Sequence, residues 1–476
     1  MRGNVEREWE WEWAVSRFAS LVRWVGMRMR ALGIAVVLVA CGRSAAPPAG
    51  TARVDVVEGG VVDAEVEREA AALQIDVDGD DEAQEVGEGS VPAHLSLTKV
   101  GTAPIALQRI CDLASFGGAL YAVHAVQPLG IDGATISKYV PGDPKPFRLV
   151  FDWNRYGEPS AGGGAGQGFL RVHPIGGRLF VPDADPPYDG FGYLDHGTEG
   201  YVFASDPSGV FAKAIGEHRR PPLAPGLDGG AGAMVLPRAY HVLDVIRYRG
   251  AMYASTGSVP PKERAWSGPS PGALHRAPDG SLARLDYVVG YPADASADVW
   301  RLTFLVRFQD RLYAGIQEYY PREPNDYVVF EPPPDVKLIA PEHMRAVRAA
   351  GLGTNGGAQT LRWYADAKTH ALYWIAASRA GGITLRVTHD GDSWELVSLP
   401  AGAGQPTDVV RFRDALVVLT ERGLYRLDGA TPIELARWDD PKVFAATDFF
   451  CVAPLAVFGG ALYAGGQNGG ALYRFE

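Results

Sequence analysis

The sequence has few of the features that reveal a chemical activity. Only three cysteines occur among 476 residues, too few for a fold held together by a disulfide framework. It contains no HExxH motif, no CxxC pair and no Walker A loop, so the short signatures of common zinc, redox and nucleotide chemistry are missing. Whether the protein is an enzyme stays open, and we expect a binding role first.

Basic residues are also in the minority. Lys and Arg number 45 against 56 Asp and Glu, which gives a net charge of −11. Nucleic-acid-binding proteins present basic surface to the phosphates, so we expect no nucleic-acid partner. The 58 glycines and 35 prolines are typical of many short strands joined by turns.

A short apolar run, Ala31–Ala40, follows Arg28 and Arg30 and precedes Cys41. It is too short to span a bilayer as a helix, but it has the length of a signal-peptide core. The letters "LVAC" that end at Cys41 resemble the lipobox of bacterial lipoproteins. The resemblance implies cleavage before Cys41, lipidation of that cysteine and a lipid-anchored place in the bacterial cell envelope. Gly42 favours the outer membrane.

Residues 27–41 form this predicted signal. The segments before and after it differ in composition. Residues 1–26 carry four tryptophans among acids and are not needed by a signal peptide. We expect translation to begin at Met27 or Met29, or else an amphipathic extension. Residues 42–93 are rich in Ala, Gly, Asp and Glu with few aromatics, a composition that predicts a disordered, acidic tether.

Within the tether, Asp76, Asp78 and Asp80 alternate as in a calcium-binding loop. An EF-hand requires Gly and Glu at the positions where Asp81 and Gly87 stand. A calcium site is therefore the weaker reading, and we expect no cofactor.

The heptapeptide "FGGALYA" occurs at Phe116–Ala122 and again at Phe458–Ala464. Five similar stretches lie between them, each with a strand end, a two-residue turn and an apolar pair that opens a second strand. The aligned apolar positions, spaced by 44 to 73 residues, are Leu120, Leu179, Met252, Leu312, Leu372, Leu416 and Leu462. This spacing is typical of four-stranded propeller blades. We therefore predict an all-β fold for residues 94–476, a seven-bladed β-propeller of four-stranded antiparallel blades, with a β-sandwich array as the alternative.

The second half of each unit also predicts a strand, a polar turn and a strand, for example over Gly200–Ala214. The last unit is one strand short, and His94–Pro104 is the natural donor of that strand. The first and seventh blades would then be neighbours, with Cys111 and Cys451 on adjacent inner strands. In an oxidising envelope they could form a disulfide, but we expect two buried free thiols in preference to it.

Two stretches resemble known propeller repeats. The hairpin that begins at Phe458, with Gly465–Gly466 after its second strand, resembles the kelch-type repeat. Thr388–Pro400, "THDGDSWELVSLP", resembles both the kelch tryptophan segment and the Asp-box turn of sialidase-like propellers. The resemblance implies the propeller fold and no particular reaction.

Long connections are expected to gather on one face, in blades 1 to 4. They are Trp153–Gly168, Pro182–Gly200, His218–His241, Gly257–Gly272, Gln317–Asp326 and Pro341–Gly357. Long loops on a rigid scaffold are where binding residues concentrate. The expected ligand-binding residues are Asp183, Asp185, Tyr188, Tyr193, Asp195, His196, Arg264, Trp266, Tyr319, Tyr320 and Arg322. Aromatic rings beside polar groups suit sugars or peptides, so we expect a glycan, peptide or envelope-protein partner.

Three other interpretations remain. Asp195, His196 and Glu199 are candidate catalytic groups for a carbohydrate hydrolase or lyase. The same residues with Asp183 and Asp185 could hold a divalent cation. A third possibility is a scaffold in an envelope complex that uses the flat face of short turns.

Overall fold

The computed structural model describes the second of two units of the chain, Glu67–Glu476, in part. The described residues are 87–103, 109–125, 134–153, 168–184, 199–212, 230–237, 239–257, 272–277, 283–291, 300–318, 325–349, 358–378, 382–427, 431–445 and 450–476. Their named elements are 28 β-strands and one short 3-10 helix, η2, Pro341–His343. Within these ranges no helix has the length and apolarity needed to cross a membrane. The predicted signal and most of the tether lie outside them.

The described strands form seven antiparallel groups of four, numbered here in chain order. Group 1 contains β2 (Ile110–Phe116), β3 (Ala119–His124), β4 (Thr135–Tyr139) and β5 (Phe147–Asp152). Group 2 contains β6 (His173–Ile175), β7 (Arg178–Pro182), β8 (Glu199–Ala204) and β9 (Gly232–Pro237). Group 3 contains β10 (Tyr240–Tyr248), β11 (Ala251–Gly257), β12 (Gly272–Arg276) and β13 (Asp286–Tyr291).

The remaining groups follow the same plan. Group 4 contains β14 (Trp300–Phe308), β15 (Arg311–Glu318), β16 (Tyr327–Phe330) and β17 (Met344–Val347). Group 5 contains β18 (Gln359–Asp366), β19 (Ala371–Ala377), β20 (Ile383–Thr388) and β21 (Glu395–Leu396). Group 6 contains β22 (Pro406–Phe412), β23 (Ala415–Thr420), β24 (Gly423–Arg426) and β25 (Ile433–Arg437). Group 7 contains β26 (Leu455–Phe458), β27 (Ala461–Gly465), β28 (Ala471–Phe475) and β1 (Leu97–Thr102).

The pairing of β1 with β28 joins the two ends of the described chain. Leu97 lies opposite Phe475, and Thr102 lies opposite Ala471. The prediction that His94–Pro104 supplies the strand missing from the last unit is confirmed. The expected all-β class and the four-stranded antiparallel groups are confirmed as well.

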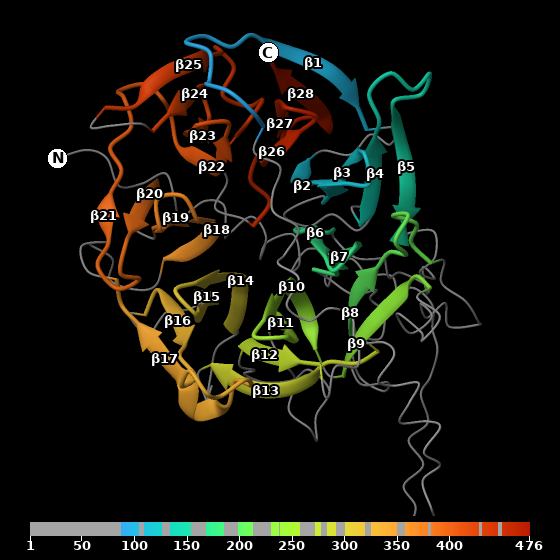
Figure 1. The fold of residues 1–476 in the computed structure, drawn as a ribbon, viewed down its shortest axis with the longest axis vertical. Helices are drawn as coiled ribbons and strands as arrows, with labels where there is room; N and C mark the ends of the chain where they lie inside the picture. Colours follow the sequence, from blue (N-terminus) through green and yellow to red (C-terminus); the bar gives the residue numbers. More distant parts are fainter. Residues whose placement is uncertain are drawn as a thin grey trace, which may run out of the picture. The chain divides into compact units, whose positions relative to one another are not determined.

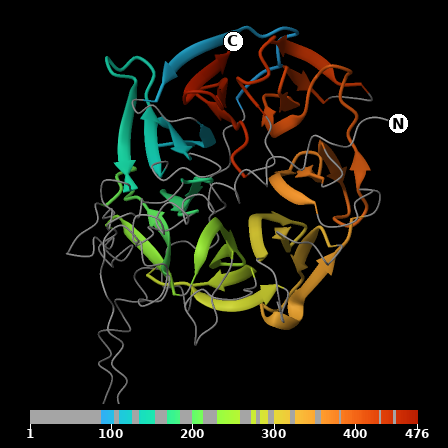
Figure 2. The same ribbon diagram turned by 180° about the vertical axis from the view of Figure 1, so that it is seen from behind.

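The groups follow one another in chain order, with their first strands toward a common centre (Figures 1 and 2). Single residue pairs join groups 3, 4 and 5 into one twelve-stranded sheet, at Gly257–Arg301 and Ile316–Gln359. Successive antiparallel strands end on opposite faces of a group. We call the face with the first-to-second-strand turns the turn face, and the opposite face the long-connection face.

Six of the seven hairpins have the predicted two-residue turn. In the two copies of the heptapeptide, Gly117 and Gly118 have φ of 53° and 72°, and Gly459 and Gly460 have 56° and 70°. Positive φ at both central positions matches the twist of the flanking strands, and glycine adopts it without strain.

The fifth hairpin does not follow the prediction. Asp366 pairs with Ala371, which leaves a turn of four residues, Ala367–His370. The Asp366 carboxylate accepts hydrogen bonds from the backbone N–H and the hydroxyl of Thr369. This side chain closes a larger turn than the two-residue pattern predicted.

The second half of group 2 also differs from the prediction of strands on both sides of a turn in Gly200–Ala214. β8 ends at Ala204, and the Asp206 carboxylate accepts from the N–H groups of Ser208 and Val210. The fourth strand is β9, further along the chain.

The connection between β8 and β9 therefore begins and ends on the turn face. The expectation that His218–His241 belongs with the long connections of the other face was wrong, and part of that stretch is strand. Pro341–Gly357 likewise contains η2 and β17 rather than loop alone.

Large aromatic side chains fill the spaces between groups. Between groups 1 and 2, the rings of Phe151 and Phe203 lie 5.0 Å apart, and those of Trp153 and Phe203 lie 4.9 Å apart. Between groups 4 and 5, the rings of Tyr327 and Trp374 lie 5.4 Å apart. Burial of such rings, together with aliphatic side chains, stabilises the contacts between neighbouring groups.

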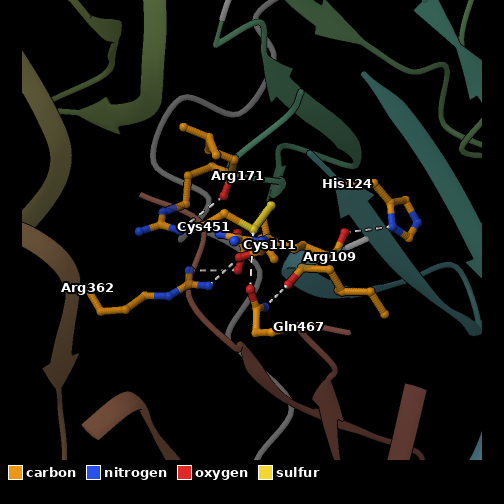
Figure 3. Close-up of a disulfide and its surroundings, with 10 residues drawn as sticks. Arg109, Cys111, His124, Arg171, Arg362, Cys451 and Gln467 are labelled. Carbon is orange, nitrogen blue, oxygen red and sulfur yellow. Dashed lines mark hydrogen bonds and ion pairs between the residues drawn. A yellow bond between two sulfur atoms is a disulfide. The ribbon is translucent and has the colours of Figure 1, made fainter. Parts of the chain in front are cut away.

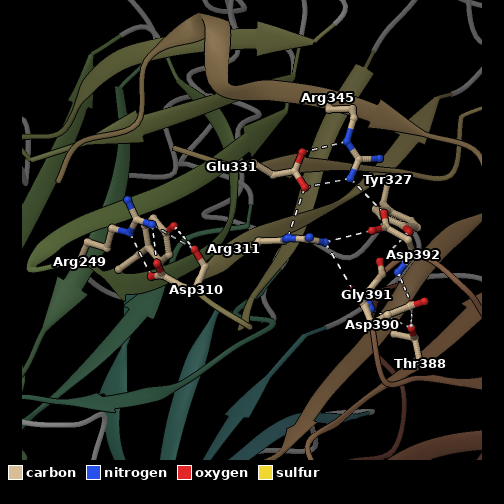
Figure 4. Close-up of polar contacts among 11 residues, drawn as sticks. Arg249, Asp310, Arg311, Tyr327, Glu331, Arg345, Thr388, Asp390, Gly391 and Asp392 are labelled. Atoms are coloured by element: carbon tan, nitrogen blue, oxygen red, sulfur yellow. Dashed lines mark hydrogen bonds and ion pairs between the residues drawn. The ribbon is translucent and has the colours of Figure 1, made fainter. Parts of the chain in front are cut away.

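The predicted Asp-box-like turn connects β20 to β21 of group 5, and its Asp392 accepts from Arg311 and Arg345 of group 4 (Figure 4). Asp390 accepts from the N–H groups of Asp392 and Ser393 and from the Thr388 hydroxyl. These donors lower the pKa of Asp390 well below its usual range. The following Trp394 donates its indole N–H to the Tyr327 hydroxyl at 2.9 Å, so the turn joins the two groups.

Candidate functional site

Most of the predicted ligand-binding residues lie outside the described part of the chain. These residues are Asp185, Tyr188, Tyr193, Asp195, His196, Arg264, Trp266, Tyr319, Tyr320 and Arg322, and the predicted lipidation site Cys41 lies outside it as well. Glu199 is the first residue of β8. Asp183 directly follows β7 and is fully buried. The Asp183 N–H donates to the Tyr201 carbonyl, and the Asp183 carbonyl accepts from the Val242 N–H. Asp183 thus connects group 2 to group 3.

Two adjacent residues, Asn325 and Asp326, hydrogen-bond residues at the ends of other connections. These residues are Tyr291, Ala349 and Ala358. The Asn325 side chain donates to the hydroxyl of Tyr291, the last residue of β13, at 2.6 Å. The two Asp326 oxygens accept from the N–H groups of Ala349 and Ala358 at 2.8 Å each. These two alanines flank residues 350–357. Burial raises the pKa of Asp326 although both N–H groups oppose the shift.

A chain of polar side chains crosses groups 3, 4 and 5 on the long-connection face. Arg301 donates to the Gln317 side-chain oxygen at 2.6 Å, and Gln317 donates to that of Gln359 at 2.9 Å. Arg301 also lies 3.1 Å from Nε2 of His241, whose Nδ1 lies 3.0 Å from the carbonyl of Ala184. Since a carbonyl only accepts, Nδ1 carries the proton and Nε2 accepts from Arg301. We call these four side chains the polar floor.

An apolar layer that contains the disulfide lies next to the polar floor. Cys111 and Cys451 are bonded, with an S–S distance of 2.07 Å (Figure 3). They belong to a buried cluster with Leu170, Phe304 and Phe450. The Arg301 guanidinium is 5.8 Å from the Phe450 ring. The two cysteines are therefore one disulfide and not two free thiols.

A layer of charged residues follows at the centre, on the side of the turn face. Its five charged residues each stand four positions before the last residue of a first strand. They are Asp112, Asp244, Arg362 and Asp408, which lie within their strands, and Arg171, which precedes β6. β-Bulges lie next to Asp112, Asp244, Arg362 and Asp408, and bulges re-aim side chains in this way.

Three aspartates of this layer connect neighbouring first strands. Asp112 accepts from the N–H of Val172 at 3.1 Å, which joins groups 1 and 2. Asp244 accepts from Leu305 at 2.7 Å and Asp408 accepts from Leu455 at 2.7 Å. These bonds join groups 3 and 4 and groups 6 and 7.

Two arginines cross the centre (Figure 3). Arg362 of group 5 donates to Asp112 at 2.9 Å and to the Cys111 carbonyl, both in group 1. Arg171 of group 2 donates to the Leu361 carbonyl of group 5 at 2.7 Å. Its guanidinium carbon lies 3.5 Å from the centre of the Phe304 ring. Burial, and then the nearby Arg362, lower the pKa of Arg171 to about 9.

Sequence reasoning missed this central layer, although the repeat contained a signal for it. Aligned on the residue before each turn, four of the first strands carry Asp or Arg at the same place and a fifth has Arg171 just before it. A charged residue that recurs at one position of otherwise apolar strands indicates a shared polar centre. The polar floor had no comparable signal, because its members occupy different positions in their strands.

The chain contains a Gly-x-Ser-x-Gly string at Gly268–Gly272. In hydrolases this string turns from a strand into a helix, whereas here its last residue is the first of strand β12. We assign it no nucleophile. Among the described residues, no group of three or more His, Cys, Asp or Glu is placed to hold a metal ion.

Comparison with known proteins adds little. No protein-family model matches the sequence, and no curated protein matches it. Solved structures similar to the chain include virginiamycin B lyase from Staphylococcus aureus, at 8% identity and TM-score 0.47 over 80% of this chain and 99% of that one. The extracellular domain of a hybrid two component system from B. thetaiotaomicron has 9% identity and TM-score 0.47, over 82% and 43%. AztD from Citrobacter koseri has 14% identity and TM-score 0.39, over 75% and 80%. Likenesses at this level carry no argument about function.

Proposed function

We propose that the protein is a lipid-anchored binding module of the bacterial cell envelope. Its second unit is a closed seven-bladed β-propeller that holds a glycan, peptide or protein partner on the long-connection face. The strand β1 paired in the last group and the disulfide between groups 1 and 7 support closure. The lipobox-like Cys41 supports the anchor.

The observation that carries the binding role is the polar floor at the strand ends of the long-connection face. Arg301, Gln317, Gln359 and His241 place a guanidinium, two amides and an imidazole in one hydrogen-bonded chain across three groups. Amides and guanidinium groups hydrogen-bond sugar hydroxyls well. Among the three partner classes, this chemistry favours a glycan.

The contacts of residues 87–95 support a direction for the proposed tether. The N–H of Val91 donates to Asp414, and Arg413 donates to the Ser90 carbonyl. A side chain at Gly87 would approach Arg413 and Gly460. Arg413–Asp414 and Gly459–Gly460 are turns of the turn face. The described residues 87–91 thus lie against the turn face, and we propose that the tether joins the second unit on that face.

The test is a ligand screen by isothermal titration calorimetry on the full chain in detergent. The panel contains peptidoglycan fragments, envelope oligosaccharides and short peptides. We expect an oligosaccharide to bind the wild type and to lose at least tenfold in affinity with Arg301→Ala. The matched control is Arg148→Ala, an exposed arginine of group 1. Binding of peptides alone would contradict the glycan preference, and equal affinity of both variants would contradict the site.

A further inference from the structure

A cavity of about 540 Å³ lies at the centre on the turn-face side. Residues from the first strands of all seven groups line it, and it extends to Gly117 in a turn of that face. The crossing arginines and the apolar layer with the disulfide lie at its inner end. Its volume lies within the usual range of small-molecule sites, about 300–1,000 Å³.

The acidic groups of this cavity are already engaged. Asp112, Asp244 and Asp408 each use both carboxylate oxygens for backbone N–H groups or for Arg362 and His173. Their side chains are 12%, 2% and 9% exposed. Among the described residues, none of these aspartates belongs to a group of three or more side chains placed to hold a metal ion.

The charged side chains that solvent reaches in the cavity are basic. His173 lies 2.6 Å from Asp244 through Nε2, and its side chain is 31% exposed. That bond leaves Nδ1 as the nitrogen that can meet a ligand. Arg307 of β14 also lines the cavity and is exposed.

We propose that this cavity is a second binding site, which takes a small organic carboxylate through the imidazolium of His173 and the guanidinium of Arg307. The site is separate from the polar floor and lies on the opposite face. It is independent of the glycan role, because the two sites share no residue.

The charges around His173 set the pH at which the site works. Asp244 and Asp112 favour the imidazolium, whereas burial and Arg171 oppose it, and the pKa of His173 is raised. Arg362 on β18, Asp408 on β22 and Arg307 on β14 line the same cavity. Because the imidazolium exists only below the raised pKa, carboxylate binding is present at pH 6 and weakens as the pH rises through that value.

Calorimetry on the full chain in detergent tests the proposal, with succinate and citrate as probes and succinamide as the uncharged control. We expect one of the acids to bind at pH 6, at least tenfold more tightly than at pH 9, and succinamide not to bind. His173→Gln keeps a donor toward Asp244 but cannot become charged, and should lower the affinity at least tenfold and abolish the pH dependence. Addition of the acid should also shift the His173 imidazole signals in NMR spectra.

Three results would overturn the proposal. They are no heat with either acid at pH 6, equal binding of succinamide, and unchanged affinity in a folded His173→Gln variant. Should that variant fail to fold, the affinity of Arg307→Gln tests the site instead. Arg307 is exposed, so this substitution should not unfold the protein. A several-fold loss of affinity then supports the site, and wild-type affinity refutes it. Failure here would leave the oligosaccharide result on the other face unaffected.

Discussion

Cys111 and Cys451 are bonded to each other although 340 positions separate them in the sequence. The bond joins the first strand of group 1 to the segment before β26 of group 7. Next to it, Gln467 donates to the Ile110 carbonyl at 2.7 Å, and Ile110 donates to the Gly466 carbonyl. The first and last groups are therefore connected by a covalent bond and by hydrogen bonds, and β1, which precedes group 1 in the chain, pairs with β28 of group 7.

Removal of this disulfide should destabilise the protein. A disulfide that closes a long loop contributes about 2–4 kcal/mol, mainly by restricting the unfolded chain. We expect Cys111→Ala with Cys451→Ala to lower the free energy of unfolding by that amount in guanidinium titrations. The control is the same titration with reductant, which should destabilise the wild type and leave the double variant unchanged. A wild type insensitive to reductant while its thiols react would contradict the structural role.

The buried pair of Arg362 and Asp112 should matter far more than an exposed pair. Arg362→Leu leaves Asp112 buried without its cation, which costs about 3–5 kcal/mol for a buried pair. The matched control is Arg148→Leu, since the Arg148–Asp143 pair is 50% and 26% exposed and such pairs contribute about 0–1 kcal/mol. Chemical denaturation measures both. Adding Asp112→Leu to Arg362→Leu should restore part of the loss, and strict additivity of the two substitutions would argue against the pairing.

Asp366 should contribute to the loss of stability in acid. Burial alone would raise its pKa, but Arg411 and Thr369 outweigh burial and lower the pKa. A lowered pKa stabilises the folded state above the unfolded value of about 4, and this contribution disappears as the pH falls through the folded value. The free energy of unfolding should therefore fall less steeply below pH 5 in Asp366→Asn than in the wild type. An Asp366→Asn variant with the wild-type slope would contradict this role.

Asp326 should hold Ala349 and Ala358, the two residues that flank residues 350–357, in place. Asp326→Ala removes the acceptor of both alanine N–H groups. Hydrogen exchange should show that these two amides lose protection, because exchange reports local opening, while the amides of β22 stay protected. Asp414→Ala, which removes the acceptor of the Val91 N–H, is the matched control and should leave Ala349 and Ala358 unchanged. Unaltered protection of both alanines in Asp326→Ala would contradict the role.

The repeat predicted much of the fold because each hairpin is a local structure. The sequence shows glycine pairs such as Gly117–Gly118, followed by a Leu. Such pairs predict the tight turns with positive φ that the structure contains. Pairing of β1 with β28 followed from counting strands. The fourth strand of group 2 was misplaced. The chain turns at Asp206, but the strand that pairs next, β9, begins only at Gly232. The repeat period does not encode the length of this insertion.

The site was less predictable. Composition pointed to the long connections, but the polar floor depends on contacts between residues such as His241 and Arg301, which are 60 positions apart. The central charged layer was visible in the alignment of the strands, yet its partners were not. Which strand Arg362 reaches depends on the arrangement of the groups around the centre and not on its neighbours in the sequence.

The most direct test of the binding role is hydrogen exchange of the wild type with and without the oligosaccharide returned by the ligand screen. The account predicts added protection of the backbone amides at Arg301, Gln317 and Gln359, and unchanged exchange at the turns Gly117–Gly118 and Gly459–Gly460. Protection confined to those turns, with none at the polar floor, would contradict it.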